Sequence, residues 1–138
     1  MTTAETVAIM RQHFLSGGIR PIATRIALLK NLKAEIKRRE DEICAALVAD
    51  FNKHPFDTFT TEIGVVCGEI DCAVKHLRRW SKPKKAHVSL ADFPAKGRVY
   101  AEGYGVALII APWNYPFQLA IAPLVGAIAA GNCAVVKP

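Results

Sequence analysis

The sequence has 138 residues, of which 51% are hydrophobic, which predicts one soluble globular unit with a modest core. Its 18 basic and 12 acidic residues give a net charge of +6, a mild bias. A membrane span needs about 20 uninterrupted apolar residues. The apolar run that begins at Val106 is broken by prolines and polar residues, so we expect no membrane span. Because the N-terminus lacks the apolar core of a signal peptide, we expect a cytoplasmic protein.

The first half of the chain carries helical patterns. Residues 2–15 are predicted to form a helix that Gly17 and Gly18 end, because glycine adopts the left-handed conformation that closes helices. Over residues 22–47 apolar side chains recur at three- and four-residue steps, with one gap. This pattern predicts a single long amphipathic helix.

A loop and a third helix are expected next. Residues 50–57 are rich in turn-forming side chains and predict a loop. The third helix is expected from about Thr61 until Pro83 stops it. Its apolar stripe is predicted to comprise Ile63, Val66, Cys67, Ile70, Val74, Leu77 and Trp80.

The last third has an α/β pattern. A linker follows the third helix, with a short strand expected at residues 87–90 that could pair with residues 98–102 as a hairpin. Residues 106–110 are a continuous apolar run, typical of a strand buried on both faces. A helix is predicted over residues 113–130, kinked at Pro123 and closed by Gly131-Asn132, and a second buried strand over residues 133–136. Strand, helix and strand form a βαβ unit.

The turn between this first strand and the helix is the candidate site, because ligands bind at the carboxyl ends of strands in such sheets. The dinucleotide fingerprint G-x-G-x-x-G is missing: Gly103 and Gly105 precede the strand and position 108 is leucine. The turn instead places the amide of Asn114 among two prolines and two aromatic residues. From the residues alone, Asn114 is either a ligand-binding amide or a helix cap.

The cysteines give no sign of a metal site. Cys44, Cys67, Cys72 and Cys133 form no C-x-x-C pair and no metal-ligand spacing with the histidines. Three of them lie in apolar periodic stretches, so we expect buried free thiols in a reducing compartment and no bound metal.

Two motifs resemble signatures of one enzyme superfamily. The sequence P-W-N-Y-P fills the turn, and G-N-x-x-V-x-K-P covers the second strand. At this spacing they resemble the cofactor domain of the aldehyde dehydrogenases. The W-N-Y-P-F form and the L-x-R-W end of the third helix resemble the class 3, fatty-aldehyde-like branch.

The resemblance implies an α/β fold in which N-terminal helices precede the first βαβ unit of a Rossmann-like cofactor domain, incomplete as given. It divides the chain into a helical region (1–81) packing on the cofactor domain, a linker and hairpin (82–103) similar to an oligomerisation element, and the start of the NAD(P)-binding domain (104–138). It also implies a homo-oligomer, expected to be a dimer, in the full-length protein.

The implied reaction oxidises an aldehyde to a carboxylic acid through a cysteine thiohemiacetal, with NAD or NADP as cofactor. By resemblance, Asn114 is an oxyanion-hole donor and Lys137 contacts the cofactor's adenosine ribose. Without a cofactor contact, Lys137 would simply be a solvent-exposed lysine at the end of a strand. The resemblance also implies residues that line the cofactor, namely Ile110, Ala111, Pro112 and Trp113. It implies that Tyr115, Gln118 and Leu119 line the aldehyde channel. From the residues alone, these three side chains could equally belong to the core.

None of the four cysteines has the flanking sequence of the family's nucleophile, and the family's glutamate base normally lies far downstream. We therefore expect an N-terminal fragment that is inactive by itself. A non-catalytic interaction or oligomerisation fragment is the alternative. Nucleic-acid binding through the basic tract at residues 78–85 is not expected, because short basic runs are usually solvated surface.

Overall fold

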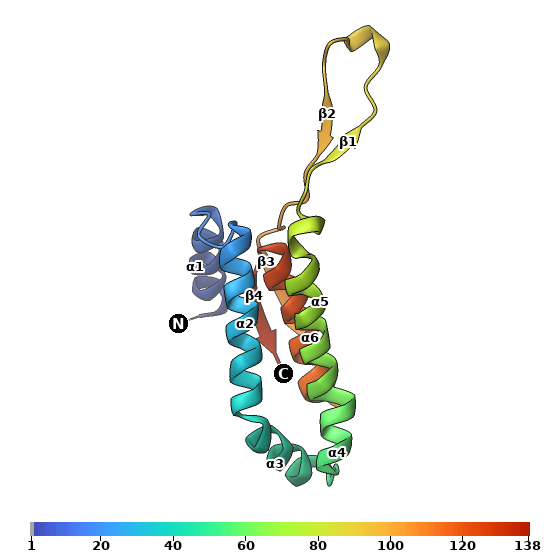
Figure 1. Cartoon of the computed structure of the whole chain (residues 1–138). Helices are drawn as coiled ribbons and strands as arrows, with labels where there is room; N and C mark the ends of the chain where they lie inside the picture. Colours follow the sequence, from blue (N-terminus) through green and yellow to red (C-terminus); the bar gives the residue numbers. More distant parts are fainter. Residues whose placement is uncertain (1) are drawn as a thin grey trace.

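The computed structural model describes residues 2–138 as helices around a small parallel sheet (Figure 1). The α-helices are α1 (Thr3–Leu15), α2 (Ile22–Arg38), α3 (Glu40–Phe51), α4 (Pro55–Thr58), α5 (Gly64–Trp80) and α6 (Pro116–Ala130). A π-helix, η1 (Phe59–Ile63), joins α4 to α5, and a short 3-10 helix is η2 (Leu90–Asp92). The strands are β1 (Lys84–Ala86), β2 (Gly97–Val99), β3 (Val106–Ile110) and β4 (Cys133–Lys137).

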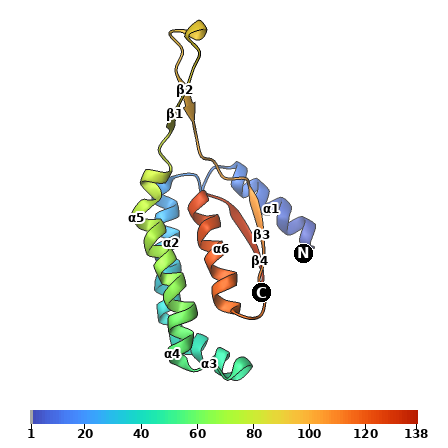
Figure 2. The same cartoon turned by 90° about the vertical axis from the view of Figure 1, so that its right-hand side faces the viewer.

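The elements stack in layers. Helices α2 and α5 lie side by side and pack on α6, which covers one face of the β3–β4 sheet, while α1 lies against the other face (Figure 2). The core is shared by α2, η1, α5 and α6, and consists of Leu29, Ile36, Ile63, Val66, Ile70, Ala73, Leu77, Val125 and Ala129. No helix within residues 2–138 is long and apolar enough to cross a membrane.

The predicted long helix over residues 22–47 is wrong: the chain breaks at Arg39, and α3 turns away from α2. Arg39 has φ −104° and ψ 17°, outside the helical region. The break falls in the one gap of the apolar pattern, between Ile36 and Ile43. Three acidic residues open α3 and two basic residues close α2, so both helix ends carry the charges that their dipoles favour.

The predicted loop over residues 50–57 is too long, because α3 continues to Phe51 and α4 begins at Pro55. Asn52 closes α3 in the left-handed conformation, with φ 51°. Consequently the third helical segment begins well before Thr61 and passes through a π turn. Its buried stripe is as predicted at most positions, but Trp80 is 47% exposed and stacks on His76. Trp80 is the last residue of α5, beyond the core.

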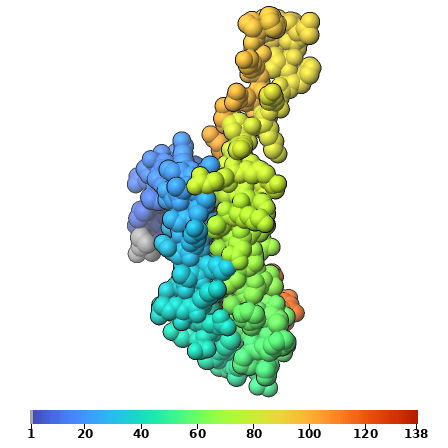
Figure 3. Space-filling model, viewed as in Figure 1, coloured from blue at the N-terminus to red at the C-terminus, as the bar shows by residue number. Residues whose placement is uncertain are grey.

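The hairpin is present, but its strands lie earlier than predicted. β1 precedes residues 87–90, which are not a strand, and β2 ends at Val99 instead of reaching Glu102. Lys84 pairs with Val99 and Ala86 with Gly97 in an antiparallel register. The hairpin projects from the helical body (Figure 3), and all residues of β1 are exposed. The hairpin is therefore an exposed two-stranded ribbon and not part of a buried sheet.

The βαβ unit is confirmed, with β3 and β4 parallel and Val106 opposite Cys133. Burial of β3 on both faces is wrong for the described chain, since Leu108 is 67% and Ile110 64% exposed. Within residues 2–138 β3 has only one neighbouring strand, so these side chains have few apolar neighbours.

Helix α6 begins three residues later than predicted, at Pro116, whose fixed φ suits the first helical position. Pro123 lies inside the helix, as expected. Gly131 ends the helix with φ 80°, a conformation that a β-carbon disfavours. Asn132 then accepts a hydrogen bond from the Gly105 amide at 2.9 Å, which ties the start of β3 to the start of β4.

Candidate functional site

The turn between β3 and α6 lies at the carboxyl ends of both parallel strands. Ile110 pairs with Lys137 at the end of the ladder, and the Ala111 amide donates to the Lys137 carbonyl at 3.0 Å. The structure thus brings Ile110 and Ala111, two of the residues that the sequence assigned to a cofactor, beside Lys137, and Pro112 and Trp113 follow them in the turn. Trp113 is 78% exposed and the Lys137 side chain is exposed, so both are accessible at this edge.

Asn114 does not cap α6. The N-cap residue is Tyr115, with φ −139° and ψ 71°, and no side-chain hydrogen bond from it closes the helix. Asn114 is exposed and lines an open hollow of about 240 Å³, together with residues of α3, the loop after it, η1 and α6. Of the two interpretations that the sequence left open for Asn114, the helix cap is wrong, and the amide borders a space that a ligand could enter.

The residue that caps α6 is Glu62, which the sequence interpretation missed. Its side chain is 0% exposed, and its Oε2 accepts hydrogen bonds from the amides of Phe117 at 2.9 Å and Gln118 at 3.2 Å. These amides belong to the first turn of α6, where N–H groups have no partner within the helix. A carboxylate also suits the positive end of the helix dipole.

Lys53 completes this arrangement. Its ammonium forms an ion pair with Glu62 Oε1 and lies 4.6 Å from the centroid of the Tyr115 ring. The Lys53 side chain is only 18% exposed, so both charges are largely withdrawn from water. Burial of an isolated carboxylate is costly, and here one ammonium and two amide donors offset that cost.

The π turn brings Glu62 to this position. The Gly64 amide donates to the Phe59 carbonyl, and a β-carbon at Gly64 would lie 2.9 Å from that oxygen. Glu62 continues the buried stripe of α5, in steps of three or four residues, with Val66, Ile70, Ala73 and Leu77. An acidic residue in line with an apolar stripe is the signal that could have identified it from the sequence.

The proposed channel residues Tyr115, Gln118 and Leu119 lie close together, but not all of them belong to α6. Tyr115 precedes the helix, although its carbonyl accepts the first helical hydrogen bond from the Leu119 amide at 2.9 Å. Gln118 and Leu119 are half-buried in the first turn of α6. The three side chains therefore lie around the start of one helix, and the Tyr115 ring faces the Lys53 ammonium.

Three of the four cysteine thiols are poorly suited to attack a carbonyl. Burial raises the pKa of Cys44, Cys67 and Cys133 above its ordinary value, which disfavours the reactive thiolate. These three thiols are half-buried and Cys72 is exposed, so the expected full burial of the cysteines is wrong. Among residues 2–138 no group of three or more histidine, cysteine or acidic side chains could hold a metal ion.

Comparison with known proteins identifies the family to which this chain belongs. The family model described as "Aldehyde dehydrogenase family" matches residues 2–138, and this chain belongs to that family. Aldehyde dehydrogenase family 3 member F1 of Arabidopsis thaliana is 40% identical over 136 residues, which is 99% of this chain and 28% of that protein. The class 3 resemblance is therefore confirmed.

Solved structures share the fold. The substrate-bound state of Staphylococcus aureus AldH is 41% identical, with a TM-score of 0.91, over 97% of this chain and 30% of that one. Glyceraldehyde-3-phosphate dehydrogenase from Methanocaldococcus jannaschii, complexed with NADP, is 20% identical with a TM-score of 0.81, over 97% and 28% of the two chains. This chain thus spans less than a third of the length of these relatives, and its α/β fold is theirs.

Proposed function

We propose that this chain supplies the oxyanion donor and the first cofactor contacts of an NAD(P)-dependent aldehyde dehydrogenase, which oxidises an aldehyde to a carboxylic acid. The observation that carries the proposal is that Asn114 lines a hollow and does not cap α6, in the turn that follows the end of β3. The family and the family 3 relatives support this assignment.

In the proposed reaction a cysteine thiolate adds to the aldehyde carbon and forms a thiohemiacetal, whose oxygen gains negative charge. The Asn114 side-chain N–H donates to that oxygen. A preorganised donor of this kind stabilises the transition state more than the ground state. The role of Asn114 is therefore electrostatic, and it transfers no proton.

The strand edge suits a nicotinamide cofactor because an ammonium donor, Lys137, and an exposed apolar turn lie next to each other there. Lys137 would donate to the adenosine ribose hydroxyls, and residues 110–113 would line the cofactor. When bound, the cofactor accepts the hydride that leaves the aldehyde carbon. The proposed cofactor is NAD or NADP.

Tyr115, Gln118 and Leu119 are proposed to line the aldehyde channel from the start of α6. None of the four cysteines has the flanking sequence of the family's nucleophile, which supports a nucleophile elsewhere in the full-length protein. The 138-residue chain by itself is therefore expected to be inactive, and aldehyde-dependent NAD⁺ reduction by the purified chain would contradict this. Four free cysteines fit a cytoplasmic location.

The hairpin is proposed to be an oligomerisation element of the full-length protein, in which it would contribute to a dimer. Its tip exposes Leu90 at 95% and Phe93 at 85%, more than an isolated monomer normally leaves to water. Replacing both with serine should lower the oligomeric mass measured by light scattering, and an unchanged mass would contradict this role.

Asn114→Ala in the full-length enzyme tests the catalytic proposal. Loss of one oxyanion donor should lower kcat by about 10²–10³-fold, with little change in the KM for aldehyde or in NAD⁺ binding. Asn31→Ala, on the exposed side of α2, is the matched control. An unchanged kcat in Asn114→Ala, or a loss confined to KM, would overturn the oxyanion role.

A further inference from the structure

Glu62 joins two segments that are distant in the sequence. One carboxylate oxygen accepts the first-turn amides of α6, and the other binds the Lys53 ammonium. The α6 partners lie 55 and 56 residues from Glu62 along the chain. The beginning of α6 is therefore fixed by a tertiary contact, in a helix whose own N-cap side chain makes no hydrogen bond.

The same contacts hold the residues that follow Asn114 in the chain. Phe117 and Gln118, which follow it after the rigid Pro116, are held by Glu62. Tyr115, its immediate neighbour, contacts the Lys53 ammonium through its ring. Glu62, Lys53 and Asn114 line the same hollow. Movement of the first turn of α6 would consequently move the Asn114 backbone.

We propose that Glu62 is a positioning residue, which keeps Asn114 in its catalytic place by holding the first-turn amides of α6. The inference rests on the proposed oxyanion role of Asn114. Such a donor must be placed within about 0.5 Å of its productive geometry, and Asn114 lies in a turn, where few backbone contacts restrain it. Glu62 and the associated Lys53 supply the missing restraint, and neither needs to touch the substrate.

The experiment is a double-mutant cycle in the full-length enzyme, with kcat expressed per titrated active site so that unfolded protein is not counted. Glu62→Ala should lower kcat by roughly 10- to 100-fold, as expected for a misplacement of about 1 Å, with a much smaller change in NAD⁺ binding. In the Asn114→Ala background the same substitution should have no further effect on kcat, because the group that Glu62 positions is gone.

Two further variants keep the test decisive. Glu62→Gln retains an oxygen for the α6 amides and should keep most of kcat, although its melting temperature falls because Lys53 loses a charged partner. Glu69→Ala, an exposed glutamate on α5, should leave kcat unchanged. A purely structural Glu62 would instead lower the yield of active sites without changing kcat for each of them.

The outcomes separate this inference from the function on which it rests. If Asn114→Ala leaves kcat unchanged, the oxyanion role fails and the positioning role fails with it. If Asn114→Ala lowers kcat but the losses of the two single variants multiply in the double variant, only the positioning role of Glu62 is overturned. A Glu62→Gln enzyme as slow as Glu62→Ala would also overturn it.

Discussion

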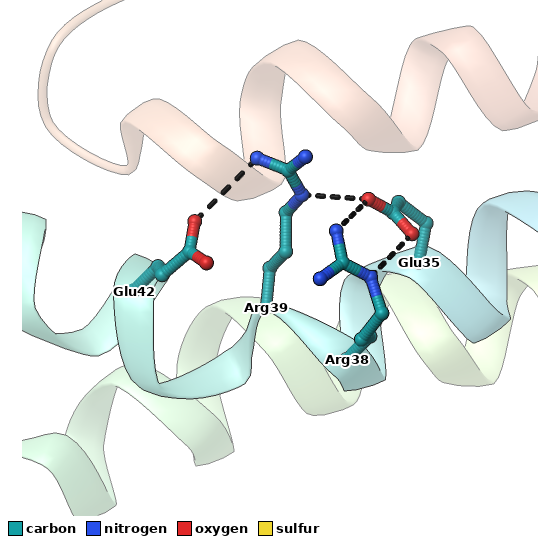
Figure 4. Close-up of polar contacts among 4 residues, drawn as sticks. All are labelled: Glu35, Arg38, Arg39 and Glu42. Atoms are coloured by element: carbon teal, nitrogen blue, oxygen red, sulfur yellow. Dashed lines mark hydrogen bonds and ion pairs between the residues drawn. The ribbon is translucent and has the colours of Figure 1, made fainter.

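Glu35 and Glu62 both bind basic side chains, but they do so in opposite settings. Glu35 is on the surface, where it accepts hydrogen bonds from Arg38 and Arg39, and Arg39 also reaches Glu42 across the break between α2 and α3 (Figure 4). Glu62 is fully buried and holds amides from another part of the chain. The surface cluster can be anticipated from adjacent charges in the sequence, whereas the buried glutamate lines the same hollow as Asn114 and depends on contacts distant in the sequence.

The largest difference between the two carboxylates should appear in stability. Glu62→Ala leaves the buried Lys53 ammonium and two α6 amides unpaired, which should lower the free energy of unfolding by about 3–5 kcal/mol. Thermal or urea unfolding measures the loss. A Glu62→Leu, Lys53→Met double variant should recover the part that comes from the unpaired Lys53 charge, although the two α6 amides still lack an acceptor. A double variant no more stable than Glu62→Ala would contradict this account.

The π turn that presents Glu62 gives a second comparison, between two glycines of α5. Gly64→Ala places a β-carbon 2.9 Å from the Phe59 carbonyl oxygen, which should cost about 1–3 kcal/mol of stability. Gly68→Ala is the matched control: nothing lies within 4 Å of its β-carbon, and alanine should stabilise the helix by up to about 1 kcal/mol. Equal melting temperatures for the two variants would show that the π turn tolerates the methyl group.

The elements that the sequence predicted correctly are those that depend on a local pattern of residues. Periodicity and glycine placement were sufficient for α1, β3, β4 and the end of α6, because these depend on local pattern. The break at Arg39 was visible only as a gap in the apolar pattern, which a single helix can also tolerate. A π turn leaves no repeat in the sequence, so the start of the third helical segment was misplaced.

In the candidate site, too, some residues could be predicted from local sequence and one could not. Asn114 and Lys137 stand out because they lie in a recognisable turn and at a strand end, and the parallel register brings these two places together. Glu62 was missed because its function depends on the start of α6, more than 50 residues away. An acidic residue on an apolar stripe suggests a buried partner, but the sequence alone does not say which one.

The smallest expected effect concerns the surface cluster and its pH dependence. Hydrogen bonds from Arg38 and Arg39 lower the pKa of Glu35 from 4.5 to about 2. Because the folded-state pKa is depressed, the ionised carboxylate stabilises the fold above pH 4.5, and this contribution disappears as the pH falls toward 2. Glu35→Gln should therefore lower the melting temperature slightly at neutral pH, and the difference should vanish in acid.

Salt provides the control for this last comparison. Glu35 is exposed, so added salt should screen its contribution at neutral pH and reduce the effect of Glu35→Gln. The effect of Glu62→Ala should change little with salt, because its partners are shielded from solvent. Melting temperatures of both variants at low and high ionic strength measure this difference. Equal salt sensitivity would mean that the Glu62 carboxylate is in contact with water, and the contrast between the two glutamates would then be one of sequence distance alone.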